Sequence, residues 1–343
     1  MALERMFTSI LICIFVCTKS YAFHLKFMGD QLSSEEKIQL KLNIENIQNN
    51  YFNNLKQFLP KLYPLNLIDL SLEVIFDENL KVDGLFIDPQ DYSCKKPCKE
   101  FIIKLNPKLI YSSSFYQTFT HEFFHFIHYL INPNEDTFLR EGLAQFYSTQ
   151  VTGIMESTNI TALNIDSHVS FFEPYSLDQP LRGLYGMHFL YVNYILSQCL
   201  SFNMDSFWKL VKGDEVNKGP KLIDSLLRNS GSSLPQCANF NDSLLNFLVA
   251  SAHNKSQLLK SDNPDQYYIR PFSQTMKVQN LSPQDLKNLK NYSPYLITVS
   301  NFKQLNVPSD LKVYFLQTAF PFSVFEFEPD SEIPYNVLIL KIN

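Results

Sequence analysis

The sequence of 343 residues predicts an α+β protein in which helices and strands occupy separate regions. Three observations predict this class. First, a helix-like segment is followed by short strand-like runs up to about residue 105. Second, apolar residues have helical spacing from residue 114 to about 252. Third, short runs of alternating apolar and polar residues, separated by prolines, follow residue 265. We expect residues 23–262 to form one domain, with an α/β part (23–131) and a helical part (132–262), followed by a separable small β domain (265–343).

The composition is that of a globular protein. Hydrophobic residues make up 45% of the chain and charged residues 18%, which excludes a disordered protein. Lys and Arg total 29 against 34 Asp and Glu, giving a net charge of -5, so the basic surface typical of nucleic-acid-binding proteins is missing. We see no repeat of fixed period, which argues against a repeat architecture.

The first 22 residues are predicted to be a signal peptide. Arg5 precedes an apolar run at residues 10–17, and small residues at Ser20 and Ala22 predict cleavage after Ala22. The apolar run is far shorter than the roughly 20 residues that span a bilayer. We therefore expect an exported protein, periplasmic or extracellular, with no stable membrane span after cleavage. Lipid attachment at Cys17 and an uncleaved anchor are the alternatives.

Four cysteines follow the predicted signal peptide: Cys94, Cys98, Cys199 and Cys237. An even number of cysteines in an exported chain predicts disulfides. We expect Cys94 to pair with Cys98 and Cys199 with Cys237, because each pair lies within one segment. A zinc site built from all four cysteines is the competing interpretation, but Cys199 and Cys237 do not form a second closely spaced pair.

Local signals place the individual elements. A helix is expected at residues 34–59, with Ser33 or Ser34 as the N-cap, Glu35 and Glu36 in the first turn and Pro60 after its end. Strands are expected at residues 70–76, 85–87 and 101–105. Helices are expected at residues 114–130, 138–149, 185–198, 204–211 and 220–227. The last strands are expected at residues 296–299, 311–317, 322–327 and 337–342.

The most informative residues form an H-E-x-x-H motif, from His121 through Glu122 to His125, on a predicted helix. Positions i and i+4 lie about 40° apart around a helix axis, so both imidazoles point to one place and can hold one metal ion. Imidazole suits zinc. The Glu122 carboxylate beside the ligands can take a proton from water that the metal activates.

A third ligand is predicted on the next helix. Glu141 follows His125 after the turn at residues 132–136, which folds the second helix back beside the first. Gly142 has no side chain and would let these two helices approach closely. The alternative is that Glu141 and both histidines are ordinary helix residues, but two histidines and an acid would then lie uncompensated on an otherwise apolar helix.

These segments resemble the gluzincin metallopeptidases, the clan of thermolysin and the zinc aminopeptidases. The resemblance rests on residues 120–125, 138–144 and 183–186 and covers about residues 37–227. It implies a zincin-like fold and a peptide hydrolase in which one zinc ion is bound by His121, His125 and Glu141, with Glu122 as the general base. It also implies that an edge strand, expected at residues 101–105, holds a peptide or protein substrate by β-augmentation.

Neighbouring families fit less well. Metzincins require Gly three residues and His six residues after the second histidine, where this chain has His128 and Ile131. Zinc aminopeptidases carry a G-x-M-E-N segment upstream of the metal helix, whereas the similar segment here, residues 153–157, lies downstream and ends in Ser157. The resemblance therefore does not extend to aminopeptidase specificity.

Further residues near the motif have open roles. His128 lies about 4.5 Å beyond His125 along the axis, so we interpret it as packing beside the site, with a ligand role as the alternative. Gln145 either orients a ligand histidine or is a solvated side chain. Gluzincins place an oxyanion donor across the cleft, which makes Tyr185 or His188 a candidate; core packing is the alternative for Tyr185.

Two other functions compete with a peptidase. The first is a non-catalytic module that binds a peptide or protein and retains a zincin fold; the presence of Glu122 favours the enzyme over it. The second is a structural zinc site, which three ligands disfavour because they leave the fourth position open.

Overall fold

The computed structural model describes residues 14–15, 24–28, 31–47, 70–89, 100–154, 170–173, 182–200, 204–214, 216–230, 237–253, 294–299, 311–316 and 335–341. It is a mixed α+β protein, as predicted, and is mostly helical. The chain separates into two compact units. The first contains Met1–Pro133 and Tyr147–Met155, and the second contains Asn134–Phe146 and Glu156–Asn343.

The first unit contains a mixed sheet with the strand order β1-β2-β3-β5-β4. Its strands are β1 (Ile14–Phe15), β2 (His24–Met28), β3 (Ser71–Phe76), β4 (Gly84–Ile87) and β5 (Glu100–Leu105). β2, β3 and β5 run parallel, whereas β1 and β4 pair antiparallel with their neighbours. The three strands predicted for this region are confirmed. β2 was missed, although its polar and apolar residues alternate.

β5 lies inside this sheet and not at its edge, because it pairs with β3 on one side and with β4 on the other. The expectation that residues 101–105 form the edge strand is therefore wrong. Among the described strands, β4 is the last one on that side. Burial fits this order: alternate residues of β3 and β5 are buried, whereas every residue of β4 is only partly buried.

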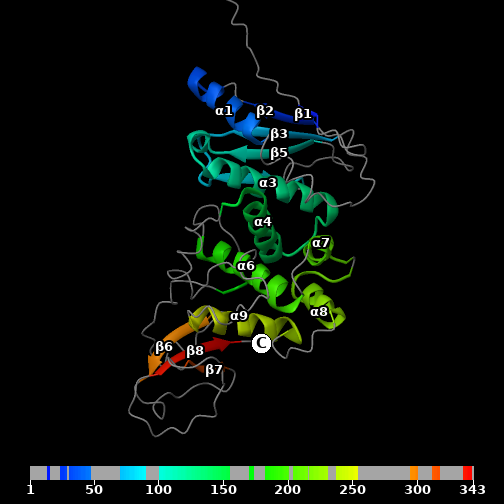
Figure 1. The fold of residues 1–343 in the computed structure, drawn as a ribbon, viewed down its shortest axis with the longest axis vertical. Coiled ribbons are helices and arrows are strands. Elements are labelled where there is room, and N and C mark those ends of the chain that lie inside the picture. Colours follow the sequence, from blue (N-terminus) through cyan, green and yellow to red (C-terminus); the bar gives the residue numbers. More distant parts are fainter. Residues whose placement is uncertain are drawn as a thin grey trace, which may run out of the picture. The chain divides into compact units, whose positions relative to one another are not determined.

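The helix α3 (Ser114–Ile131) packs against this sheet, and Figure 1 shows it beside β5. Phe101 of β5 lies 5.0 Å from Phe126 between ring centroids, and Phe27 of β2 lies 5.7 Å from Phe119. The helix was predicted at residues 114–130 and is confirmed. Its phenylalanines bury apolar area against the strands, which fixes the direction in which the remaining faces of the helix point.

The helix α1 (Ser34–Asn46) begins where the sequence predicts. The Ser33 hydroxyl accepts a hydrogen bond from the Glu36 N–H at 3.2 Å, and the Ser33 N–H donates to the Glu36 carboxylate at 2.7 Å. This reciprocal pair is a capping box and satisfies N–H groups that have no partner within the helix. The end predicted near Pro60 lies outside the described residues.

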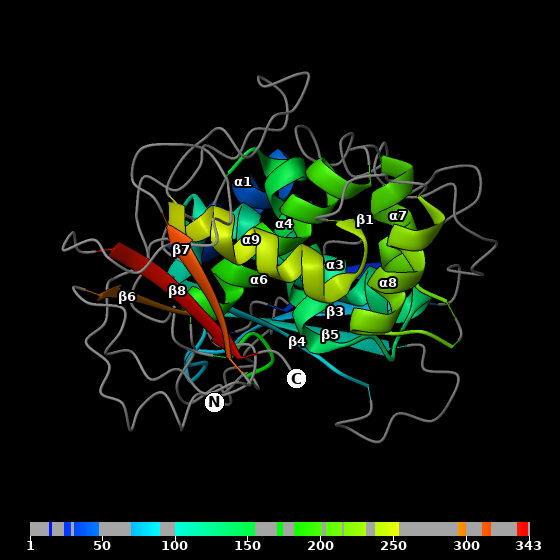
Figure 2. The ribbon, with the colours of Figure 1, turned by 90° about the horizontal axis from the view of Figure 1, so that it is seen from below.

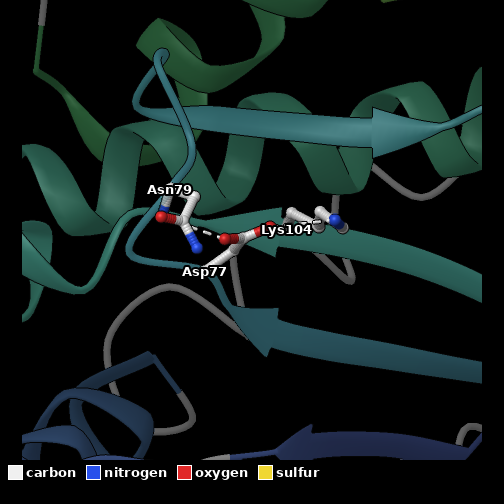
Figure 3. A network of polar contacts seen from close by, with 3 residues as sticks. All are labelled: Asp77, Asn79 and Lys104. Atoms are coloured by element: carbon white, nitrogen blue, oxygen red, sulfur yellow. Dashed lines mark hydrogen bonds and ion pairs between the residues drawn. The ribbon is translucent and has the colours of Figure 1, made fainter.

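The turn after β3 is held by a polar network around Asp77 (Figure 3). The Asp77 carboxylate accepts a hydrogen bond from the Lys104 ammonium at 2.9 Å and from the Asn79 N–H at 3.0 Å. The hydrogen bond from Lys104 is the largest cause of a lowered pKa of the Asp77 carboxyl. Because Lys104 belongs to β5, the network ties the β3–β4 connection to the strand that pairs with β4.

The second unit is mainly helical. It contains α6 (Arg182–Tyr194), which continues into a π-helical turn η4 (Ile195–Cys199), then α7 (Met204–Lys212), α8 (Gly219–Asn229) and α9 (Phe240–His253). The helices predicted at residues 185–198, 204–211 and 220–227 are confirmed. The helix predicted at residues 138–149 is α4 (Thr137–Thr152), whose N-terminal part belongs to this unit. No helix among the described residues has the length and apolar character needed to cross a membrane.

A three-stranded antiparallel sheet follows the helices, with β8 (Tyr335–Lys341) between β6 (Pro294–Val299) and β7 (Leu311–Leu316) (Figure 2). Three of the four predicted C-terminal strands are thereby confirmed, and the one at residues 322–327 lies outside the described residues. β7 contacts α9, and the whole sheet is grouped with the helices of the second unit. That residues 265–343 can be separated from the rest stays a prediction.

The predicted disulfide between Cys199 and Cys237 is confirmed. It links the end of η4 to the residues that precede α9, and both sulfur-bearing side chains are buried. The other predicted pair, Cys94 with Cys98, lies outside the described residues.

Replacing both partners, as Cys199→Ala with Cys237→Ala, should lower the free energy of unfolding by about 4 kcal/mol. The loop closed by the bridge spans 38 residues in sequence, and opening it raises the chain entropy of the unfolded state. Urea denaturation of the variant and of oxidised wild type measures the difference, with reduced wild type as the control. Equal urea midpoints for the variant and the oxidised wild type would show that the bridge does not form in solution.

Candidate metal centre

The two histidines of the motif converge on one side of α3. Their Nε2 atoms lie 3.1 Å apart, and their ring centroids lie 4.7 Å apart with the ring planes at 82°. Two ligand atoms that each sit about 2 Å from a tetrahedral ion are separated by about 3.3 Å, so the observed pair fits one shared ion. The predicted helical placement of His121 and His125 is therefore confirmed.

Glu141, on α4, completes a group of three side chains that could hold a metal ion. The ligand atoms of His121, His125 and Glu141 all lie within 4.8 Å of one another, and all three side chains are partly buried. Among the residues that the structure describes, this is the group of His, Cys, Asp and Glu side chains that meets the geometry of a metal site. Two imidazoles and a carboxylate are a donor set that suits zinc and leaves a coordination position open.

Glu122 points toward β4. Its side chain is buried, with 7% exposed, and its Oε2 accepts a hydrogen bond from the Phe86 N–H at 2.7 Å. A buried carboxylate needs such a donor, because leaving the charge unsolvated would cost several kcal/mol. The neighbouring Gly84 lies so close that an added Cβ would meet Glu122 Cγ at 2.8 Å. Gly84 and Phe86 are site residues that the sequence did not predict, although the glycine at the start of a short strand was a signal for them.

His128 is the next histidine along α3, and it is nearly fully buried, with 1% exposed. Its ring lies 5.6 Å from that of Phe124. The group of three possible ligands contains Glu141 and not His128, which accords with the interpretation of His128 as a packing residue. Gln145, one turn after Glu141, is buried as well, so the alternative of a solvated glutamine is wrong.

Of the two candidates for the oxyanion donor, His188 is already engaged. Its Nε2 lies 2.7 Å from the carbonyl oxygen of Phe171, so Nε2 must carry the proton and donate it. In the neutral ring Nδ1 is then an acceptor and cannot donate to an oxyanion. Tyr185 lies on α6 with a partly buried side chain, and its role as the donor stays a prediction.

His188 gives the second unit a predicted pH dependence. Burial lowers the pKa of His188 to about 4, against the weaker opposing effects of the Phe171 carbonyl and the charge of Glu141. In the unfolded chain the pKa is about 6.5, so the unfolded state binds more protons below that value and stability is lost as the pH falls from about 6.5 toward 4. Between pH 7 and pH 5 this group should cost about 2 kcal/mol.

Urea denaturation of wild type and His188→Asn at pH 7 and at pH 5 measures this loss, because the variant lacks the titrating ring. The wild type should lose more stability than the variant between the two pH values. An equal loss in both proteins would show that His188 is not buried as a neutral ring.

Gly142 allows a close approach, but to a different helix from the one expected. A Cβ at this position would lie 2.7 Å from the His188 carbonyl oxygen and 2.7 Å from Val192 Cγ2, both on α6. We expected Gly142 to allow a close approach of the helix that carries His121. This expectation is wrong, because the nearest atoms to a Cβ at Gly142 belong to α6. The missing side chain lets α4 pack on α6, which fixes the position of the neighbouring Glu141.

In comparisons with known proteins, no family model and no curated protein matches this chain.

Proposed function

We propose that this chain is an exported zinc-dependent peptidase of the gluzincin type. The observation that carries the proposal is the convergence of His121, His125 and Glu141, with the Glu122 carboxylate on the same helix as the two histidines. Two histidines and one carboxylate are the ligand set that catalytic zinc sites use, and a glutamate next to the first histidine is the base that such peptidases need.

The residues of the chain divide the chemistry between them. His121, His125 and Glu141 would hold the zinc ion, which when bound supplies a Lewis acid that lowers the pKa of water and polarises the scissile carbonyl. Glu122 accepts the proton of the attacking water at a carboxylate oxygen and later returns it to the leaving amine. The partial burial of the ligands excludes part of the bulk water and strengthens these interactions.

We also propose that β4 holds the substrate. It is the last described strand on its side of the sheet and runs antiparallel to β5. The Phe86 N–H on this edge already donates to Glu122, so a peptide would add through the other outward-pointing main-chain groups of β4, and it would then lie next to α3, which β4 contacts. β4 thereby takes the role that was expected for residues 101–105.

In the proposed zincin architecture, the sheet and α3 of the first unit form the N-terminal subdomain. The helices from α4 to α9 form the C-terminal subdomain. The disulfide between Cys199 and Cys237 supports export to the periplasm or the extracellular space, because such bridges persist in oxidising compartments.

A broad peptide library tests the proposed activity. Wild-type protein loaded with Zn²⁺ should cleave a subset of the peptides, lose this activity on treatment with a chelator and regain it when Zn²⁺ is restored. Zinc binding without cleavage of any peptide would contradict the peptidase and favour the non-catalytic binding module.

A further inference from the structure

The main chain of β4 presents a donor at the side of the strand that faces away from β5. The Asn106 N–H donates to the Asp83 carbonyl at 2.9 Å. Asp83 and Asn106 therefore form a hydrogen-bonded pair, and they directly precede the facing pair of Gly84 and Leu105 in β4 and β5. In an antiparallel ladder such pairs alternate with pairs whose N–H and C=O groups point outward. Phe86 falls on an outward-pointing position, and its N–H is the group that donates to Glu122 Oε2 at 2.7 Å.

Phe86 is itself held in place by its side chain. The ring lies 6.5 Å from that of Phe101 on β5 and 6.1 Å from that of Tyr129 on α3. Aromatic contacts of this kind restrict the side chain and with it the backbone. The donor that meets Glu122 is therefore on a strand anchored both to the sheet and to the helix that carries the carboxylate.

Gly84, two residues earlier, faces the same side chain. An added Cβ would lie 2.8 Å from Glu122 Cγ, 2.9 Å from Glu122 Oε1 and 2.6 Å from Thr118 Cγ2. Distances below 3.0 Å are essentially never found for a real Cβ, so any larger residue would push Glu122 or Thr118 aside. Only glycine leaves the observed position of the Glu122 carboxylate accessible.

We propose that β4 positions the catalytic base: the Phe86 N–H holds one oxygen of Glu122, and Gly84 leaves the room in which the carboxylate sits. This inference rests on the proposed peptidase function and adds Gly84 as a positioning residue for the reaction. A general base acts only within hydrogen-bond reach of the proton that it accepts, and a carboxylate fixed at one oxygen loses the rotamer freedom that would take it away. The other carboxylate oxygen then accepts the proton of the attacking water.

The contact can be observed directly and without an activity measurement. Leu85-Phe86 is the only Leu-Phe pair in the sequence, so protein with ¹³C-carbonyl leucine and ¹⁵N-phenylalanine gives one amide signal, from Phe86. A hydrogen bond to a carboxylate moves an amide proton downfield. The signal should shift upfield in Glu122→Ala and stay in place in Thr118→Ser. An unchanged signal in Glu122→Ala would overturn the contact.

The catalytic role is tested by Gly84→Ala combined with Thr118→Ser, compared with Thr118→Ser alone. Thr118→Ser removes the methyl group that an alanine at position 84 would strike first, so the combined variant leaves the contacts with Glu122 as the remaining conflict. We expect kcat to fall by at least about tenfold in the combined variant, because part of the contribution of the base is lost. KM and the zinc content should stay close to those of the control.

Equal kcat in the combined variant and its control would overturn the positioning role, while leaving the peptidase function intact. A folding defect would be recognised by loss of cooperative melting, and the Phe86 signal of Glu122→Ala would then decide on the contact. Failure of the proposed function itself is seen in the wild type, as zinc binding without hydrolysis, before any β4 variant is compared.

Discussion

Glu122→Gln should lower the rate of peptide hydrolysis by at least about a hundredfold and leave the zinc content unchanged. The amide cannot accept the proton of the attacking water, and general bases contribute factors of this size. The amide oxygen can still accept the hydrogen bond from the Phe86 N–H, so the buried side chain keeps its partner. Single-turnover hydrolysis of the best library peptide, with zinc measured on the same samples, checks both halves of the expectation.

The control for this variant is Glu78→Gln, which removes a carboxylate at an exposed position of the turn between β3 and β4. It should retain the rate of the wild type. Full activity in Glu122→Gln would end the proposed mechanism, because another group would have to accept the proton.

Glu141→Ala should weaken zinc binding by at least about a hundredfold, whereas His128→Ala should have a much smaller effect. The first variant removes one of the three converging ligand atoms, and the second removes a ring that packs against Phe124. Equilibrium dialysis with Zn²⁺ gives both affinities. Circular dichroism is needed beside it, since removal of the nearly fully buried His128 leaves a cavity.

The opposite ranking would contradict the assignment of Glu141. If His128→Ala abolished zinc binding and Glu141→Ala left it intact in folded proteins, the third ligand would be His128 and the metal would lie further along α3.

The local elements and the paired histidines could be predicted from the sequence because their signals are short-range. The helical period of residues 114–130 alone places His121 and His125 on one face, and the structure has their Nε2 atoms 3.1 Å apart. Ser33 and Glu36 likewise mark the start of α1, because a capping box involves residues only three positions apart.

Features that depend on long-range order could not be predicted in the same way. The residues 101–105 do not by themselves indicate that β5 lies between β3 and β4. The strand order depends on which faces and edges are buried in the sheet as a whole. Gly142 is a second example, because its close neighbour His188 on α6 lies 46 residues further along the chain. The hydrogen bond from Phe86 to Glu122 likewise joins residues that are 36 positions apart. A glycine in the sequence indicates that another part of the chain packs closely against it, but it does not identify that part.

His121, His125 and Glu141 together should bind one zinc ion, and the zinc stoichiometry of metal-stripped protein measures this. After dialysis against Zn²⁺ and removal of free metal, the wild type should retain one ion per chain by elemental analysis, and His121→Ala with His125→Ala should retain none while still melting cooperatively. A wild type that retains no zinc, or a folded double variant that retains as much as the wild type, would show that these residues do not form a zinc site.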